Sequence, residues 1–430
     1  MVCRKLIAAG FALLFAGATQ AAPLPETGAN VHEGVASCAT SVCHGKVSPD
    51  PNSPVLLNEY RTWQRSDYHS GSYQTLMGKQ SKAIAKKLGL TSAHTAKMCL
   101  DCHADNPPAD KRGRRFYVNE GVGCEACHGG AGQWLETHAE QGTSHADNLA
   151  KGMYPTEQPM ERAKLCLSCH LGTQSKFATH EIMGAGHPRL SFELEVFTVN
   201  QPRHYDVDAD YRERKPYIAS VNMWMAGLLV SSMQTLELLQ EEWFTKETLT
   251  PELSFYQCHA CHHPMDKLRW SPEGGAAALP PGTIRLNDAS LTMLQAVLDI
   301  LGNDTAATLQ NGINQLHSAS MKDRASVVAV AANLQKALVG LDKSLVGGTY
   351  SDAQKKLLRA GLVQRSASGG FRHFTVAEQA FLAVETLSIA LKDNQRIEKN
   401  MDAWFKTVED ENDFIPQQFA AFASKLRSAL

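Results

Sequence analysis

Long apolar runs and an excess of charge of one sign are both missing from this sequence. The 430 residues include 42 Lys and Arg against 44 Asp and Glu, and no basic face indicates nucleic-acid binding. Beyond the N-terminus, the apolar stretch 218–233 contains Asn222 and several serines. It is too short and too polar to span a membrane, which takes roughly 20 apolar residues. The 169 residues after Cys261 contain no cysteine, so any cysteine chemistry is confined to the first part of the chain.

The N-terminal residues 1–21 predict a secretory signal peptide. Arg4 and Lys5 precede an apolar run of about a dozen residues and a small-residue cleavage zone near Ala21. We therefore expect export to the periplasm, with Cys3 removed together with the signal.

The ten remaining cysteines form five pairs, and a histidine follows the second cysteine of every pair. Four pairs have the spacing C-x-x-C, and the first has C-x-x-x-x-C. The five motifs are Cys38, Cys43 and His44; Cys99, Cys102 and His103; Cys124, Cys127 and His128; Cys166, Cys169 and His170; and Cys258, Cys261 and His262. Covalent haem c attachment needs this pattern, because two thiols add to the two vinyl groups of the porphyrin and the next side chain ligates iron. The sequence therefore predicts five haem c groups.

Two other uses of ten cysteines fit less well. A disulfide framework is usual in short secreted chains, and it gives no reason for a histidine after each pair. Structural zinc would use the C-x-x-C pairs two at a time, with four ligands per metal, and it does not need five adjacent histidines either.

Further histidines supply candidate sixth ligands for the irons. Fifteen of the 17 histidines lie between His32 and His263, the stretch that holds the cysteines. Those outside the five motifs are His32, His69, His94, His138, His145, His180, His187, His204, His259 and His263. A second imidazole closes an iron to substrates and keeps its potential low, which favours electron transfer over chemistry at the iron.

Three segments around the motifs carry a resemblance to a known family. They are Trp63-Gln-Arg-Ser66-Asp-Tyr-His69, the run from Gly121 through His128 with His138 ten residues on, and His187-Pro188-Arg189. Over residues 30–205 the chain resembles the cytochrome c554 family of multihaem cytochromes, and the larger group whose haem packing recurs in hydroxylamine oxidoreductase and pentahaem nitrite reductase.

The resemblance implies crossed ligation between distant segments. The implied pairs are His69 with His128, His138 with His44, and His187 with His170. It also implies that the iron at His103 can be five-coordinate and open to chemistry. The wide first motif and the presence of a fifth site depart from the four-haem family pattern. His94, His180 and His204 are therefore further candidates for the second and fifth irons.

Changes of composition along the chain predict a mainly α fold. We expect a loop-rich multihaem cytochrome domain over 22–270, in which haems replace side chains as the core, a linker over 271–282, and an antiparallel helical bundle over 283–430. Apolar residues at helical spacing predict helices over 81–88, 160–167, 217–244, 291–301, 307–316, 324–345, 352–362, 376–391 and 417–426. Thr375 and Glu378 have the spacing of a capping box.

These features favour a periplasmic electron carrier with redox partner proteins as donor and acceptor. The alternative is an oxidoreductase that acts on a small nitrogen or sulfur compound at one open haem. For that reaction the iron at His103 is the candidate, with His94, Lys97, Asp101 or Arg112 as helpers. A third hypothesis, a subunit of a membrane quinol-oxidising complex, rests on the helical bundle alone. The sequence does not indicate an oligomeric state.

Overall fold

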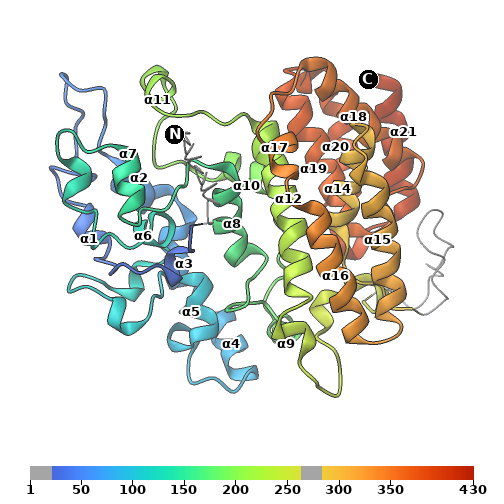
Figure 1. Ribbon diagram of the computed structural model, residues 1–430, viewed down its shortest axis with the longest axis horizontal. Helices are drawn as coiled ribbons and strands as arrows, with labels where there is room; N and C mark the ends of the chain where they lie inside the picture. The colour runs from blue at the N-terminus through green and yellow to red at the C-terminus, as the bar shows by residue number, and fades with distance from the viewer. Residues whose placement is uncertain (1–21, 263–282) are drawn as a thin grey trace, which may run out of the picture.

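The computed structural model describes residues 22–262 and 283–430, so the expected signal peptide and linker both lie outside the described residues. The described chain is mainly α, as predicted, and it has two isolated β-bridges but no strand. Figure 1 shows a loop-rich half, formed by the first part of the chain, beside a bundle of longer helices formed by the second part. Across these same ranges, none of the helices combines the length and apolarity needed to span a lipid bilayer.

Short helices separated by loops make up the N-terminal half. They are α1 Val35–Cys38, α2 Glu59–Ser66, α3 Ser72–Leu76, α4 Lys79–Lys87, α5 Lys97–His103, α6 Cys124–His128, α7 His145–Ala150, α8 Pro159–His170, α9 His180–Gly184, α10 Leu194–Asn200 and α11 Ala209–Arg214. Helices this short are marginal in water unless other groups pack on them. The one separate apolar cluster in the described part of this half is small: Tyr73, Leu76, Ala85, Ala93, Leu100 and Ala104. Side chains alone therefore give this half little core.

Longer helices form the bundle. They are α12 Ser220–Leu238, α13 Glu242–Thr245, α14 Ala289–Ile300, α15 Thr305–Ser320, α16 Arg324–Leu338, α17 Leu341–Leu345, α18 Asp352–Ala367, α19 Phe374–Ala390, α20 Asn394–Phe405 and α21 Pro416–Ala429. Their apolar faces share one large core that includes the fully buried Trp224, Trp404 and Phe419. Helix α12 packs on α14, α16 and α19 within the bundle and on α8 and α10 of the other half. This helix therefore joins the two halves, as its position in Figure 1 shows.

Several predicted helices differ from those observed. The helix expected over 217–244 is split into α12 and α13, and the one expected over 324–345 ends at α16 and restarts as α17. Gly340 separates the latter two with a φ of 86°, a left-handed conformation that suits glycine at a helix end. The sequence analysis missed α20, whose polar and charged first turns hide the spacing of Ile397, Met401 and Trp404.

The expected capping box is wrong. Helix α19 begins at Phe374, one residue before Thr375, and no side chain caps its first turn. Glu378 instead accepts a hydrogen bond of 2.6 Å from Ser191 and lies 3.6 Å from Arg189. This carboxylate therefore ties the two halves together.

Candidate haem sites

Three of the cysteine motifs end a helix. Helices α5, α6 and α8 end at His103, His128 and His170. Residues i, i+3 and i+4 share one face of a helix, so C-x-x-C-H places both thiols and the imidazole on the same side. One porphyrin can therefore meet all three side chains.

The first and fifth motifs close by the same backbone hydrogen bond. The N–H of His44 donates to the carbonyl of Cys38 at 3.1 Å, and the N–H of His262 donates to that of Cys258 at 2.7 Å. The wider first loop turns tightly at Gly45, where a Cβ would lie 2.0 Å from the carbonyl oxygen of Ala39. Only glycine fits there, and the two extra residues leave the closure of the motif unchanged.

Each motif histidine faces one other histidine across a gap of constant width. The ring centroids are 6.2 Å apart for His44 and His138, 6.3 Å for His103 and His187, 6.2 Å for His128 and His204, 6.3 Å for His170 and His69, and 6.2 Å for His262 and His180. A metal–imidazole bond of about 2 Å, with about 1 Å from nitrogen to ring centre, puts two trans imidazoles roughly 6 Å apart. The spacing of all five pairs fits one iron in each gap.

Five of these ten imidazoles use Nδ1 for a hydrogen bond to an oxygen. The pairs are His44 with Glu59 Oε2 at 3.0 Å, His69 with Asp67 Oδ1 at 3.0 Å, His103 with the Ser72 carbonyl at 3.3 Å, His138 with the Trp134 carbonyl at 3.2 Å, and His187 with the Pro188 carbonyl at 2.7 Å. Metal-bound histidines usually donate their second ring N–H to a carboxylate or carbonyl in this way. The arrangement leaves Nε2 for the iron.

Burial keeps two of the motif imidazoles neutral. It lowers the pKa of His128 to about 3 and that of His170 to about 4. Neutral imidazole has the lone pair that ligates a metal, so these side chains are in the ligating form at neutral pH. The carboxylates of Glu59 and Asp67 raise the pKa values of His44 and His69 through their hydrogen bonds.

The described cysteines, ten in all, form no disulfide, although thiols of different motifs lie beside each other. The neighbouring Cys124 thiol lowers the pKa of Cys38, and the pKa of Cys124 is raised well above its usual value in turn. In the same way the Cys102 thiol lowers the pKa of Cys169 to about 6. The first motif therefore adjoins the third, and the second adjoins the fourth.

A cavity of about 1340 Å³ opens between the second and fourth motifs. Its lining includes the cysteines and histidines of both motifs, together with His69 and His187, which face them. Pockets for single small molecules usually measure about 300–1,000 Å³. The cavity is therefore large enough for more than one flat ring system, and its thiols and imidazoles are the groups that haem c requires.

Comparison with known proteins agrees with this chemistry. Residues 37–129 match the family model described as cytochrome c554 and c-prime. This segment is cytochrome c554-like. The match covers 93 residues (129 − 37 + 1), under a quarter of the 430, and it includes the first three motifs. The chain is thus a c-type cytochrome with a role in electron transfer and with haem c as its cofactor. No curated protein and no solved structure matches it.

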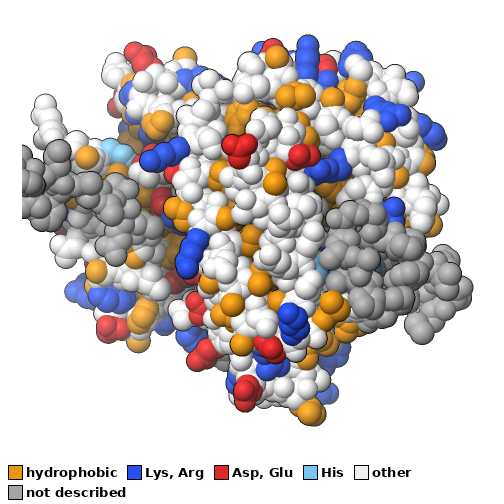
Figure 2. Space-filling view, turned by 45° about the vertical axis from the view of Figure 1, so that its right-hand side comes forward, with side chains coloured by type: hydrophobic (Ala, Val, Ile, Leu, Met, Phe, Trp, Pro, Cys, Tyr) orange, Lys and Arg blue, Asp and Glu red, His pale blue; other side chains and the backbone are white. Residues whose placement is uncertain are grey.

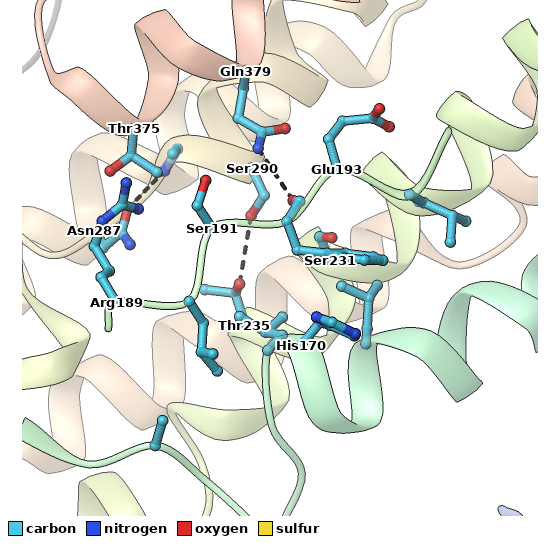
Figure 3. Close-up of a pocket in the computed structure, with 18 of the residues that line it drawn as sticks. His170, Arg189, Ser191, Glu193, Ser231, Thr235, Asn287, Ser290, Thr375 and Gln379 are labelled. Atoms are coloured by element: carbon cyan, nitrogen blue, oxygen red, sulfur yellow. Dashed lines mark hydrogen bonds between the residues drawn. The ribbon is translucent and has the colours of Figure 1, made fainter. Parts of the chain in front are cut away.

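In this cytochrome a second, smaller cavity of about 150 Å³ lies where the fourth motif meets the bundle (Figure 3). Its lining includes both His170 and Cys258, so the fourth and fifth motifs are neighbours. Thr235 and Ser290 approach each other here, with their hydroxyl oxygens 3.4 Å apart. The space is too small for a typical ligand.

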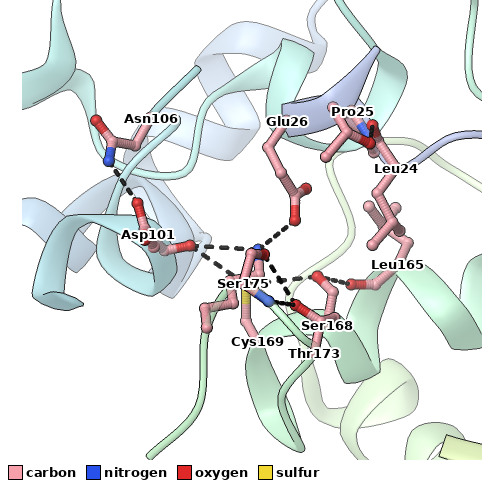
Figure 4. A network of polar contacts seen from close by, with 12 residues as sticks. Leu24, Pro25, Glu26, Asp101, Asn106, Leu165, Ser168, Cys169, Thr173 and Ser175 are labelled. Atoms are coloured by element: carbon pink, nitrogen blue, oxygen red, sulfur yellow. Dashed lines mark hydrogen bonds and ion pairs between the residues drawn. The ribbon is translucent and has the colours of Figure 1, made fainter. Parts of the chain in front are cut away.

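A buried cation lies where the second and fourth motifs of the cytochrome meet. Lys176 is 7 % exposed, and its Nζ lies 3.0 Å from Glu26 Oε1 and 3.3 Å from the carbonyl oxygen of Asp101. Figure 4 shows Glu26, Asp101 and Cys169 gathered around this point. The sequence analysis did not single out Lys176, because nothing in its local sequence indicates burial.

Two of the three ligand pairs implied by the family resemblance are wrong. His138 does face His44, but His69 faces His170 instead of His128. Gln201, at the end of α10, donates to Asp67 at 2.8 Å and so fixes the turn that carries His69. Phe197, one turn earlier on α10, lies beside His170 with ring centroids 6.3 Å apart.

His187 faces His103 instead of His170, at the spacing that a second imidazole ligand needs, and this placement disfavours the open iron expected at His103. The loop before His187 is held by Gln80 of α4, which donates to the carbonyl of Gly186 at 3.0 Å. His204 takes the place opposite His128.

Among the described residues, the remaining candidate histidines face no motif histidine, and the ring of His259 lies 5.9 Å from that of Phe374 between centroids. The ring of His94 lies near that of Tyr73, at 6.3 Å between centroids. His32 hydrogen-bonds Asp105 and the carbonyl of Pro25 through its two ring nitrogens. His145 pairs with Glu157 at 3.2 Å, and His263 lies outside the described residues.

Proposed function

We propose that this cytochrome is an exported electron carrier that holds five haem c groups, each ligated by two histidines. One observation carries the proposal: every motif histidine has a histidine opposite it, at a centroid distance of 6.2–6.3 Å. An iron with two imidazoles has no vacant coordination position, so it exchanges electrons without binding a substrate.

The chain's own residues attach, orient and enclose the haems, while bound haem c supplies the redox centre. The cysteine pairs hold each porphyrin edge. Backbone carbonyls and the carboxylates of Glu59 and Asp67 fix the imidazole rings through Nδ1, which sets the plane of each ring and strengthens it as a ligand. The haems also supply the apolar packing that the short N-terminal helices lack.

Contacts between motifs support a continuous electron route. Cys38 with Cys124 links the first and third sites, and Cys102 with Cys169 links the second and fourth. Cys127 of the third site, whose pKa burial raises, also interacts with Cys166 and Cys169 of the fourth. The small cavity is lined by both His170 and Cys258, so the fifth site lies next to the fourth. The proposed order is first, third and fourth, with the second and fifth sites as separate branches from the fourth.

An oxidoreductase acting on a small nitrogen or sulfur compound is the less favoured function, because it needs an open iron. The suggested helpers also have structural partners. Lys97 pairs with Asp101, and Arg112 donates to Asn106 Oδ1 at 2.8 Å. The implied relation to the hydroxylamine oxidoreductase and pentahaem nitrite reductase group stays a prediction, as do the periplasmic location and the redox partner proteins.

Ligand addition separates the carrier from the enzyme. The holoprotein, produced in a host that matures c-type cytochromes, is mixed with cyanide when oxidised and with nitric oxide when reduced, and its optical spectrum is followed. The carrier is expected to show no spectral change. A change equal to one haem would support the oxidoreductase instead.

A further inference from the structure

One part of the surface carries much more positive than negative charge. Residues 79–115 contain eight exposed cations and one exposed carboxylate, Asp110. The cations are Lys79, Lys82, Lys86, Lys87, Lys97, Arg112, Arg114 and Arg115. By contrast, residues 283–430 contain 16 basic and 15 acidic residues, and Figure 2 shows the two signs interspersed over the bundle. The excess is therefore local, and these eight side chains are called the basic surface below.

Most of the basic surface has no carboxylate to balance it. Lys97 pairs with Asp101, but the other seven cations make no ion pair with any residue in 22–262 or 283–430. Four lysines share the nine residues of α4, which contains no acidic residue. Lys86 and Lys87 lie in the last turn, where cations suit the helix dipole, but Lys79 and Lys82 lie towards the N-terminal end and do not serve the stability of α4.

Helix α4 has two distinct faces. Ser81 and Ile84 line the large cavity of the second and fourth sites. Lys79, Lys82 and Lys86, spaced by three and four residues, share another face and are exposed. The helix therefore covers the haem cavity with one face and presents its charge to solvent with the other.

The basic surface also borders the second haem site directly. Lys97 and Arg112 belong to the lining of the large cavity together with Cys99 and Cys102. Met98, next to Cys99, is 43 % exposed. In the proposed order of haems the second site is the end of a branch, and such an end is where an electron enters or leaves the protein.

We propose that the basic surface docks an acidic redox protein, which exchanges electrons with the haem of the second site. The inference rests on the proposed function, because a redox protein would exchange electrons here only if the haem of the second site carries electrons. Long, hydrated lysine side chains suit a transient contact. Their electrostatic field speeds the encounter with an acidic protein, and their flexibility keeps the complex weak. Complementary charge of this kind acts mainly on the association rate and on the choice of partner.

The test uses a plant-type [2Fe–2S] ferredoxin as the acidic probe. Reduced ferredoxin is mixed with the oxidised holoprotein in a stopped-flow instrument, and haem reduction is followed over a range of salt concentrations. The double variant Lys82→Glu with Lys86→Glu reverses two charges on the outer face of α4. The control variant, Lys356→Glu with Lys399→Glu, reverses two exposed lysines of the bundle.

Wild-type protein and the control are expected to react fast at low salt and to slow steeply as salt rises. The α4 variant should react at least about tenfold more slowly at low salt and should lose most of its salt dependence. Equal rates for the α4 variant and wild type, or an equal loss in the control, would overturn the proposal.

Two further experiments distinguish a failure of the docking surface from a failure of the proposed function. Photoreduced riboflavin, a small reductant that needs no extended docking surface, should reduce all three proteins at similar rates. If it fails to reduce the wild type, the electron-carrier function fails, and the docking surface with it. Wild-type protein is also mixed with vesicles that contain phosphatidylglycerol at physiological salt. Binding that the α4 variant loses, without any effect on ferredoxin, would assign the basic surface to a membrane and overturn an acidic protein partner.

Discussion

His103 and His187 face each other with their ring centroids 6.3 Å apart and their planes inclined at 82°. Both use Nδ1 for a backbone carbonyl, that of Ser72 for His103 and that of Pro188 for His187. The first histidine ends α5, and the second follows α9. The tertiary fold, and not local spacing, therefore places a second histidine opposite His103, where the family resemblance implied none.

Replacing His187 with alanine should open the second iron alone. We expect a high-spin signal from one haem, together with cyanide binding at that haem, because no other described histidine faces His103. Electron paramagnetic resonance (EPR) of the oxidised holoprotein, with and without cyanide, measures the high-spin signal. The matched control is His94→Ala, which should leave all irons low-spin because His94 lies beside Tyr73. An entirely low-spin His187→Ala variant, or an opened iron in the control, would mean that the pairing is incorrect.

The angles between imidazole planes predict the shapes of the EPR signals. His44 and His138 are nearly parallel at 13°, whereas three other pairs are inclined at 82–86° and the fifth at 40°. Parallel rings split the iron dxz and dyz orbitals and give a rhombic signal, and perpendicular rings leave them nearly degenerate and give a highly anisotropic one. We expect one rhombic signal from the nearly parallel pair, and His138→Ala should remove it. If the rhombic signal persists in the His138→Ala variant, the signal belongs to another haem.

Replacing Lys176 with methionine should lower the reduction potential of the haems at the second and fourth sites. Reduction adds a negative charge, which the buried ammonium between these sites stabilises, and the variant also leaves Glu26 without this partner. Spectropotentiometric titration of the holoprotein measures the shift. Lys176→Arg keeps the charge and should keep the potentials near those of the wild type. Equal potentials for the methionine variant and the wild type would exclude this role.

Asp288 stabilises the bundle at neutral pH. It is buried, lies 2.9 Å from His317 and accepts a bond of 2.7 Å from Arg285. Burial opposes its charge, but these hydrogen bonds outweigh burial and lower the pKa of Asp288 well below its ordinary value. A carboxyl with a lowered folded-state pKa adds stability above its unfolded pKa of about 3.9, and that stability is lost as the pH falls below it.

Asp288→Asn should therefore destabilise the protein by about 3–5 kcal/mol at pH 7, as for other broken buried ion pairs, and by less at pH 3. Guanidinium unfolding followed by circular dichroism measures both values. Asp352→Asn removes an exposed partner of Lys355 and should change little. A loss that is equally large at both pH values would assign the effect to packing and not to charge.

The sequence was sufficient to predict that the two cysteines and the histidine of a C-x-x-C-H motif lie together, because that geometry is local. Two cysteines and a histidine within five residues share one side of a helix end wherever they occur, as at the end of α8. The wide first motif needed only a tight turn at Gly45 to reach the same closure. The mainly α fold followed equally from local apolar spacing.

The histidine that faces each motif histidine could not be predicted in the same way. Which motif histidine His69 faces depends on where α10 lies, since Gln201 at the end of α10 donates a hydrogen bond to Asp67. His204 belongs to a loop with no regular spacing to mark it, and only the folded chain brings it to His128. Lys176 was missed for a similar reason, because its burial arises from Glu26 and Asp101, both far away in the sequence.

The most direct test of five bis-histidine haems is a joint count of haem and spin state in the oxidised holoprotein. Intact mass and pyridine haemochrome absorbance give the number of haems per chain, and integrated EPR gives the share that is low-spin. Five haems, all low-spin, are predicted. Fewer than five haems, or a high-spin signal equal to one haem, would contradict it.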